Sequence, residues 1–330
     1  MTKPDQSLEW AIQYLTSCND KMDIHTKEIV ETSYSRVYEI KMGEQIVYLK
    51  QTPALLFHEP KMLAFLEEQG VSHAPKLLAE EPDLLSFLMT SCGEISLRNL
   101  FKKKININQL RKGIANFTNI QRLLENKIPT LLSVGTLDWR LDKFSSLYDA
   151  LLRQDKLLIS DGLTEKEIEQ LHQLYQTCVS LCERLSDYSI PETLVHCDFH
   201  ENNMLFDYKT KDINIIDWGE TVITHPFFSL NGCLWNITYF YAVKESDLIY
   251  AKLQEACVKS WLNLHNKPQL LNILNMANKL QGIFAALSYE RIYVATKNQI
   301  KTVQQEHHGS IAGCLRTFIN CNLSALKNRF

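Results

Sequence analysis

The sequence predicts an α+β chain of two lobes, a small β-rich N-terminal lobe followed by a larger and mostly helical one. Strand-like segments dominate up to residue 90, and helical periodicity dominates after it. The 330 residues exceed the length of one average domain, which leaves room for two lobes around a cleft. We place the boundary so that residues 1–91 form the first lobe and residues 92–330 form the second.

The N-terminal lobe is expected to be a five-stranded sheet with one inserted helix. Leu8, Ile12 and Leu15 recur at helical spacing and predict a further helix at the start of the chain. The inserted helix should end at Gly70, because glycine commonly stops a helix. The strand-like segments are EIVETSY, SRVYEIKM and EQIVYLK within residues 27–50, and then residues 76–79 and 84–90.

The C-terminal lobe is expected to be helical apart from one short strand pair at residues 204–217. Apolar residues recur there every three or four positions, which is the period of an amphipathic helix. Helices are predicted at residues 96–104, 107–126, 141–154, 164–186, 227–242, 247–263, 268–300 with a break, and 310–328.

The composition argues against several classes of protein. With 45% hydrophobic and 22% charged residues, the chain resembles an ordinary globular protein. No apolar run reaches the roughly 18 to 20 residues of a membrane span, and MTKPDQSLEW lacks the features of a secretory signal. A net charge of −3 without a long basic block does not indicate a basic surface for binding nucleic acid. We expect a cytoplasmic protein with reduced cysteines and no membrane or nucleic-acid partner; the oligomeric state stays open.

The sharpest motif is LVHCDFHENNMLFD, in which His196, Asp198 and Asn203 follow the pattern H-x-D-x-x-x-x-N. A carboxylate can orient an attacking hydroxyl group and accept its proton, while amide and carboxylate oxygens can bind magnesium. The strand pair that follows should return the chain, so that Asp217 of a D-W-G tripeptide lies beside Asn203. Singly, these residues could be a buried histidine, a cap and a turn former. Their joint spacing favours phosphoryl transfer, with His196 bracing the loop.

Two charged residues of the N-terminal lobe fit the same chemistry. A phosphate-transfer site of this type needs a lysine at the end of a strand and a glutamate on the next helix that orients the lysine. Lys50 ends the strand-like IVYLK, and Glu59 lies in the first turns of the helix that follows. Each alone could be a solvated surface charge, and the downstream motif favours the functional interpretation.

Together these features resemble the aminoglycoside phosphotransferase and choline kinase family, the small-molecule relatives of protein kinases. The resemblance runs over nearly the whole chain. It implies the protein-kinase-like two-lobed fold, an alcohol group as phosphate acceptor, ATP with GTP as a possible substitute, and Mg²⁺. The matching stretches are SRVYEI, VYLK, SHAPKLL, FLMTSCGE, VHCDFHENNMLF, IIDWGE and HPFFSL.

The resemblance also implies roles for individual residues. Asp198 would be the catalytic base, and Asn203 and Asp217 would hold magnesium. Lys50 and Glu59 would position the phosphates. The nucleotide base would be bound by Tyr48 against its face, Met89 at the back of the pocket, and the hinge from Thr90 to Cys92.

The turn between the first two strands, ETSYSR, has no glycine. Loops that cover phosphates commonly use glycine, because it lets backbone amides approach the ligand. Ser33 and Ser35 are expected to donate their hydroxyl groups to the phosphates instead.

The acceptor is expected to be a small molecule rather than a protein. Only about eight residues separate Asp217 from the helix that HPFFSL begins, and no A-P-E sequence ends the segment. Aminoglycoside-like, amino-alcohol and sugar acceptors stay open, because a cationic acceptor could use either carboxylates or aromatic rings. The candidates are Glu201, Glu220, Glu290, Trp218, Trp235, Tyr239, Tyr241, Trp261 and Tyr289; core packing is the alternative for most of the aromatic ones.

Two further hypotheses remain at this point. The chain could be a nucleotide-binding pseudokinase or interaction module without turnover, for which the glycine-free loop is the support. It could also be a kinase of protein side chains, which the short segment after Asp217 disfavours.

Overall fold

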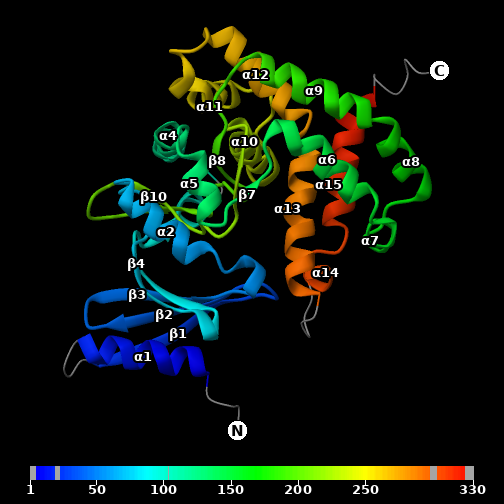
Figure 1. Cartoon of the computed structure of the whole chain (residues 1–330). Coiled ribbons are helices and arrows are strands. Elements are labelled where there is room, and N and C mark those ends of the chain that lie inside the picture. Colours follow the sequence, from blue (N-terminus) through cyan, green and yellow to red (C-terminus); the bar gives the residue numbers. More distant parts are fainter. Residues whose placement is uncertain (1–4, 19–22, 103, 298–302, 324–330) are drawn as a thin grey trace.

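The computed structural model describes residues 5–18, 23–102, 104–297 and 303–323, and it has the two-lobed α+β architecture (Figure 1). The first lobe is an antiparallel sheet of five strands in the order β1-β2-β3-β5-β4. Its elements are α1 (Gln6–Cys18), β1 (Ile24–Glu31), β2 (Arg36–Met42), β3 (Gln45–Gln51), α2 (Glu59–Glu68), β4 (Leu77–Glu81) and β5 (Ser86–Thr90).

Alternating side chains along β3 and β5 serve opposite faces of this sheet. Leu49 and Leu88 belong to a small core that α1 completes with Ala11 and Leu15. Lys50 follows Leu49 directly, so its side chain lies on the other face, where α2 separates the sheet from the helical lobe (Figure 1). The strand period therefore determines that this lysine faces the second lobe.

The second lobe is mostly helical. Its helices are α3 (Leu97–Phe101), α4 (Ile107–Leu124), α5 (Ile128–Ser133), α6 (Leu141–Leu152), α7 (Asp155–Ser160), α8 (Glu165–Gln173), α9 (Tyr175–Asp187), α10 (Phe227–Tyr241), α11 (Leu248–Val258), α12 (Lys267–Asn278), α13 (Gln281–Thr296), α14 (Val303–Glu306) and α15 (Ser310–Cys321). No helix in these described stretches is both long and apolar enough to cross a membrane. The last residues of the two predicted helices at 268–300 and 310–328 lie outside the described part.

Two expectations for this lobe are wrong. The helix predicted at 164–186 is two helices, because the chain turns at Leu174 between α8 and α9. The lobe also holds two three-stranded sheets, ordered β10-β9-β6 and β7-β11-β8, rather than one strand pair. The additional strands have two to four residues each, too short for an alternating pattern to be visible. The strands are β6 (Ile95–Ser96), β7 (Leu137–Asp138), β8 (Thr193–His196), β9 (Met204–Phe206), β10 (Ile213–Ile215) and β11 (Thr221–Thr224).

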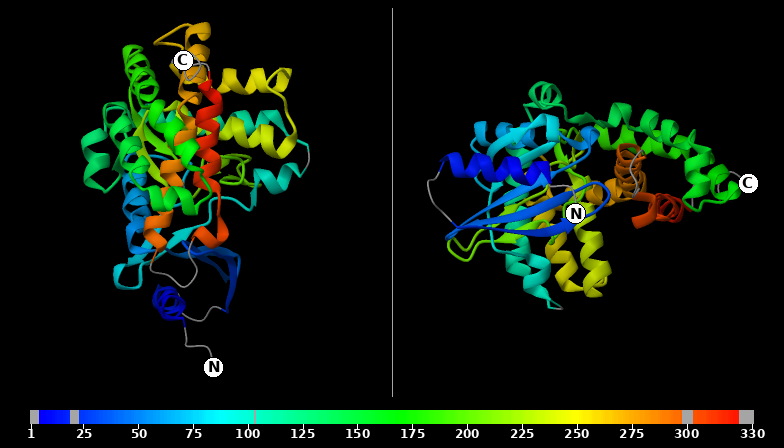
Figure 2. Two further views of the ribbon diagram at one scale, coloured as in Figure 1. Left: turned by 90° about the vertical axis from the view of Figure 1, so that its right-hand side faces the viewer. Right: turned by 90° about the horizontal axis from the view of Figure 1, so that it is seen from below.

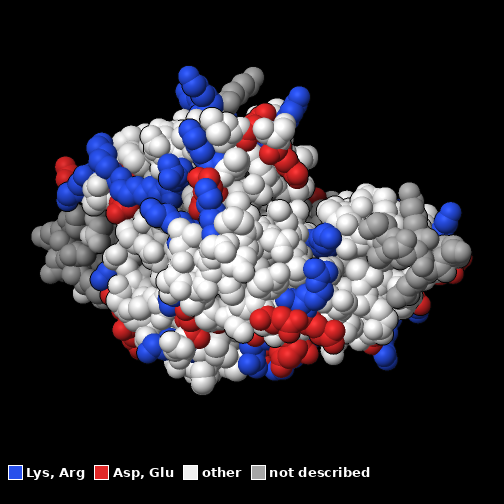
Figure 3. Space-filling model, turned by 90° about the horizontal axis from the view of Figure 1, so that it is seen from above, with Lys and Arg blue, Asp and Glu red and all other residues white. Residues whose placement is uncertain are grey.

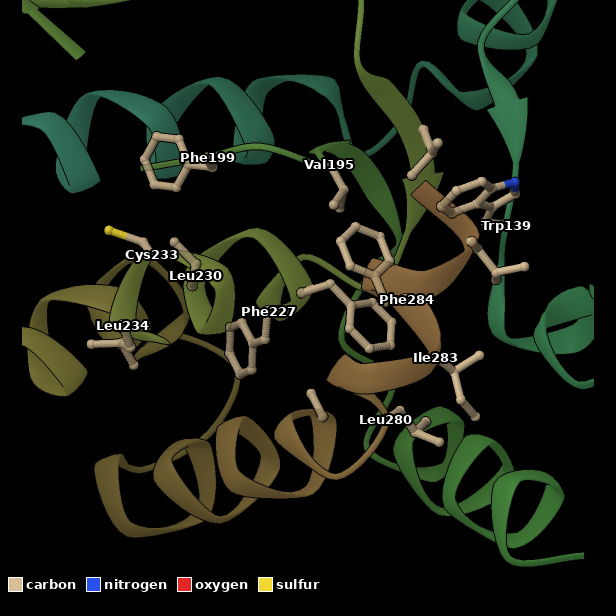
Figure 4. Packing of buried hydrophobic residues seen from close by; sticks show 14 of the residues in the cluster. Trp139, Val195, Phe199, Phe227, Leu230, Cys233, Leu234, Leu280, Ile283 and Phe284 are labelled. Carbon is tan, nitrogen blue, oxygen red and sulfur yellow. The ribbon is translucent and has the colours of Figure 1, made fainter. Parts of the chain in front are cut away.

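Helix α13 runs through the core of this lobe and carries side chains that many elements contact. Figure 4 shows Phe284 packed among residues from several segments. Its ring stacks on Phe228 at 4.8 Å and meets the edge of Trp139 at 5.8 Å. Helix α15 lies along α13 (Figure 2), where a Cβ atom at Gly282 would approach the carbonyl oxygen of Cys314 to 2.4 Å. The position of α13 is thus strongly constrained, which matters for the site below.

Candidate active site

The loop between β8 and β9 carries the H-x-D-x-x-x-x-N motif and is closed by a hairpin. Strands β9 and β10 pair so that Met204 lies opposite Ile215. The backbone N–H of Ile216 then donates to the carbonyl oxygen of Asn203 at 3.0 Å. This register places Asn203 directly beside the turn that begins at Asp217, which is the arrangement expected from the spacing.

Asp198 is held as a carboxylate by its neighbours. Asn203 Nδ2 donates to Oδ2 at 2.9 Å, and His200 Nε2 lies 2.9 Å from Oδ1. The enclosed position disfavours the charged form, but the hydrogen bonds and positive charge of His200 outweigh it and lower the pKa of Asp198 to about 2. The side chain still exposes 45% of its surface, so an acceptor can reach it.

His196 is fully buried and supports this loop. Its Nδ1 accepts a hydrogen bond from the backbone N–H of Asp198 at 3.1 Å. Because Nδ1 is the acceptor, Nε2 carries the proton and donates to the carbonyl oxygen of Ile216 at 3.0 Å. Burial lowers its pKa, which favours this neutral tautomer. The ring therefore joins the Asp198 loop to the strand that leads to Asp217.

Lys50 lies at the centre of a buried charge cluster that joins both lobes. Its Nζ donates to Glu59 Oε2 at 2.6 Å and also to Asp217 Oδ1. Glu59 uses its other oxygen to accept the backbone N–H of Trp218 at 2.9 Å. Burial alone would lower the pKa of Lys50, but the two carboxylates raise it above its usual range, so the ammonium stays charged.

The oxygen atoms that could bind a divalent cation are available. Within the described residues, Asn203 Oδ1 and Asp217 Oδ2 have no hydrogen-bonding partner in the protein, and hard cations prefer such amide and carboxylate oxygens. These described ranges hold no group of three or more His, Cys, Asp and Glu side chains suited to a metal ion. One amide and one carboxylate oxygen fit Mg²⁺, because this ion commonly takes one or two carboxylates and completes its shell with phosphate and water.

Asp217 adopts an unusual backbone conformation at this point, with φ of +68°. A residue with a side chain rarely takes this left-handed conformation, and it persists when surrounding contacts over-determine it. Contacts from Lys50 and from the neighbouring Trp218 amide supply that constraint. Strain of this kind concentrates at functional sites.

A third carboxylate, that of Glu220, belongs to the same cluster. Burial, together with the nearby charges of Asp198 and Asp217, raises the pKa of Glu220 to about 8. The guanidinium of Arg291 acts in the opposite direction without reversing the shift. Glu220 is thus largely protonated at neutral pH in this structure.

The loop between β1 and β2 contains Ser33 and Ser35, and both of the Ser33 donors are used within the protein. The backbone N–H of Ser33 donates to the two carboxylate oxygens of Glu306 at 2.9 and 3.1 Å, and its hydroxyl donates at 2.9 Å. The Ser35 N–H donates to Thr32 Oγ1 at 2.9 Å. The hydroxyl group of Ser33, expected to donate to phosphate, donates in this structure to the carboxylate of Glu306.

The residues expected around the nucleotide base lie where the two lobes join. Tyr48 of β3 pairs with Met89 of β5 in the sheet. Thr90 ends β5, and its hydroxyl accepts the backbone N–H of Lys76 at 2.9 Å. The carbonyl oxygen of Cys92 accepts a hydrogen bond from Asn214 Nδ2 and is therefore occupied.

The acceptor candidates fall into buried and exposed groups. Trp218 and Glu201 are fully buried, and Glu201 Oε1 accepts from Arg98 Nε at 2.7 Å. Their burial argues against direct contact with an acceptor. Trp235 and Tyr239 are exposed and stack at 5.1 Å on one side of α10. The others are Glu290, bonded to Gln154, the buried Trp261, and the partly buried Tyr241 and Tyr289.

Several residues of this site were not anticipated from the sequence. His200 lies inside the motif, two positions after Asp198, so its place in the sequence was a usable signal. Arg291 and Glu306 lie in helical segments far from any motif, and His58 precedes Glu59 without a distinguishing pattern. Only the folded chain brings Arg291 and Glu306 to the site.

Comparison with known proteins decides the family. The model of the phosphotransferase enzyme family matches residues 33–257, about two thirds of the chain. The chain belongs to this family. The match contains every catalytic and metal-binding candidate of this phosphotransferase, and it confirms the resemblance noted in the sequence.

Solved structures share the fold of the phosphotransferase. An ethanolamine kinase from Plasmodium vivax has 13% identity and a TM-score of 0.58, covering 96% of this chain and 89% of that chain. A choline kinase from Streptococcus pneumoniae has 12% identity and a TM-score of 0.58, covering 95% and 99%. An aminoglycoside phosphotransferase from Streptomyces rimosus, solved with ADP and streptomycin, has 14% identity and a TM-score of 0.53, covering 84% and 98%. No curated protein matches the chain. The kinase-like fold class predicted from the sequence is confirmed.

Proposed function

We propose that this phosphotransferase moves the γ-phosphate of ATP to a hydroxyl group of a small acceptor. One observation carries the proposal: Lys50 joins Glu59 of the sheet lobe to Asp217, and the hairpin holds Asp217 beside Asn203 and Asp198. The proposal is supported because the described part of the chain brings together a buried ammonium group, an amide and a carboxylate oxygen without a protein partner, and a carboxylate open to solvent. A kinase requires this combination.

In the proposed reaction Asp198 orients the acceptor hydroxyl and accepts its proton. The hydroxyl oxygen forms a bond to the γ-phosphorus while the bond to the bridging oxygen of ADP breaks. A carboxylate with a pKa of about 2 is a weak base, so orientation is its larger contribution, as expected when proton transfer is late. Asn203 and Asp217 would hold Mg²⁺, whose charge balances that of the phosphates, and Lys50 would bind the α- and β-phosphates.

The substrate side of the proposal concerns the nucleotide and the acceptor. The nucleotide would lie between residues 1–91 and 92–330, with ATP preferred and GTP possible. Helix α10 begins at Phe227, soon after Asp217, which leaves no long segment on which a peptide could dock. An aminoglycoside-like, amino-alcohol or sugar acceptor is consistent with relatives that bind streptomycin or act on choline and ethanolamine. The face in Figure 3 carries charges of both signs, which does not suit a nucleic acid.

Nucleotide binding is the first test of this function. ATP with Mg²⁺, supplied at a hundred times its dissociation constant, should stabilise the protein by about 2.7 kcal/mol. The shift is measured by thermal unfolding with and without Mg²⁺. No stabilisation by either ATP or GTP would refute the proposal.

Turnover is the second test. A panel of aminoglycosides, amino alcohols and sugars is screened for acceptor-dependent ADP release. With an active acceptor, Asp198→Asn should lower turnover by roughly 10²- to 10⁴-fold while nucleotide binding persists. Asp187→Asn, at the exposed end of α9, is the matched control. Normal turnover in Asp198→Asn removes that residue from the mechanism, and binding without turnover across the panel favours the pseudokinase.

A further inference from the structure

Arg291 of α13 extends from the helical lobe to the turn that carries Asp217. One nitrogen, Nη2, contacts two acceptors, the carbonyl oxygen of Gly219 at 3.1 Å and His58 Nδ1 at 3.2 Å. That nitrogen carries two hydrogens, so it can donate to both at once. The helix beneath it is fixed by the packing of Phe284 shown in Figure 4. Arg291 is therefore a donor on a rigid support.

The directions of the hydrogen bonds beyond Arg291 follow from which groups can donate and which can accept. The hydroxyl of Thr221 donates to the carbonyl oxygen of Trp218 at 3.0 Å. It must then accept from His58 Nε2, which lies 3.4 Å away, so Nε2 carries the proton and Nδ1 is free to accept from Arg291. Burial and the positive charge of Arg291 lower the pKa of His58 to about 3, which keeps the ring neutral. A directed chain thus runs from Arg291 through His58 and Thr221 to the carbonyl of Trp218.

This chain ends on the strained turn after Asp217 and holds both of its following carbonyl groups. Trp218 O is fixed through Thr221, and Gly219 O is bound by Arg291 directly. On the opposite side, the Trp218 amide is bound by Glu59, the neighbour of His58 at the start of α2. The turn is therefore held from α2 and from α13 together, as a residue with φ of +68° requires.

We propose that Arg291 is a positioning residue of the phosphoryl-transfer site. Together with His58, it couples α13 to the start of α2 and sets the orientation of the Asp217 carboxylate. The inference rests on the proposed function, because positioning matters through the cation that Asp217 would bind. Arg291 has no hydrogen bond to Glu220 among the described residues, and its Nη2 bonds to the turn and to His58 instead.

The first experiment measures how much Mg²⁺ the protein needs for nucleotide binding. Binding of a fluorescent trinitrophenyl-ATP is titrated with Mg²⁺ in the wild type and in Arg291→Met. The variant should need about tenfold more Mg²⁺ for half-maximal binding, the lower end of the loss seen when an orienting partner of a ligand is removed. Arg153→Met, which breaks an exposed pair with Asp149, should leave this value unchanged. An unchanged Mg²⁺ requirement in a folded Arg291→Met overturns the proposal.

The second experiment tests the chain itself and does not depend on nucleotide. The ¹⁵N spectrum of His58 should show the Nε2-protonated tautomer in the wild type, and Arg291→Met should shift the Nδ1 resonance, because Nδ1 loses its donor while Thr221 still holds Nε2–H. Thr221→Val should raise the Mg²⁺ requirement, and Thr221→Ser, which keeps the hydroxyl, should restore it; equal values for the two variants refute the chain. If Arg291→Met does not fold, the comparison of the two Thr221 variants takes its place as the test. If the wild type shows no Mg²⁺-dependent binding of the ATP analogue, the proposed function is refuted. The His58 spectrum then still tests whether the hydrogen-bond chain from Arg291 exists.

Discussion

Glu59→Gln tests whether the buried charge cluster holds the candidate active site together. The carboxylate is fully buried, with Lys50 Nζ on one oxygen at 2.6 Å and the Trp218 amide on the other at 2.9 Å. Glutamine keeps an oxygen for the amide but turns an NH₂ group toward the ammonium. The change therefore removes one interaction, the ion pair, and leaves the shape of the side chain intact.

The expected loss of stability depends on the partner that Lys50 keeps, which is Asp217. Removing one partner from a buried ion pair costs about 3–5 kcal/mol when the other charge is left unpaired. Here Asp217 still binds the ammonium, so the loss should be closer to that of a hydrogen bond to a charged group, about 1.5–3 kcal/mol. We expect the free energy of unfolding to fall by about 1.5–3 kcal/mol.

Urea unfolding of the chain without ligand measures this loss, and the slope m shows whether the unfolded state has changed. The matched control is Glu67→Gln, which breaks a pair with Lys76 at 2.8 Å between side chains that are 47% and 64% exposed. An exposed pair contributes less than about 1 kcal/mol. If Glu59→Gln loses no more stability than Glu67→Gln, the cluster does not stabilise the fold as reasoned.

Three further predictions concern the same site. Between its ordinary pKa of 4.5 and the folded value of about 8, Glu220 keeps a proton that the unfolded chain has lost. The free energy of unfolding, measured in EDTA, should therefore fall as pH rises through this window. Glu220→Gln should reduce this dependence on pH, and an equal dependence in the variant contradicts the reasoning. Glu306→Gln should lower the half-saturating ATP concentration about threefold, because its negative charge competes with phosphate at the loop; a higher value would mean that the contact helps nucleotide binding. A Cβ atom at Gly219 would meet the fixed Glu59 Oε2 at 3.0 Å, so Gly219→Ala should unfold at lower urea concentration, whereas Gly313→Ala, with open space, should not; similar midpoints refute the clash.

Much of the site could be predicted because its signals are local in the chain. The loop and hairpin from His196 to Asp217 span about twenty residues, and the strand pairing that closes them depends on neighbouring apolar residues and a polar turn. Lys50 and Glu59 were accessible for the same reason, since a strand end and the first turn of the next helix are close in sequence.

Other features could not be predicted. The strands β8 and β11 are buried and β7 has only two residues, so all three lack the alternation that identifies a half-buried strand, and their pairing defines them. Burial also distinguishes residues that the sequence does not: Trp218 and Trp235 are equally aromatic, but Trp218 is enclosed and Trp235 is exposed.

The amino-acid sequence by itself determined the chemistry of the phosphotransferase, because carboxylates, amide and lysine at this spacing are specified by short-range structure. The tertiary structure alone decided what surrounds that chemistry. Arg291 reaches His58 across 233 positions of the chain, and Glu306 reaches Ser33 across 273. No local periodicity encodes such contacts, because they depend on how α13 and the segment after it pack against the other lobe.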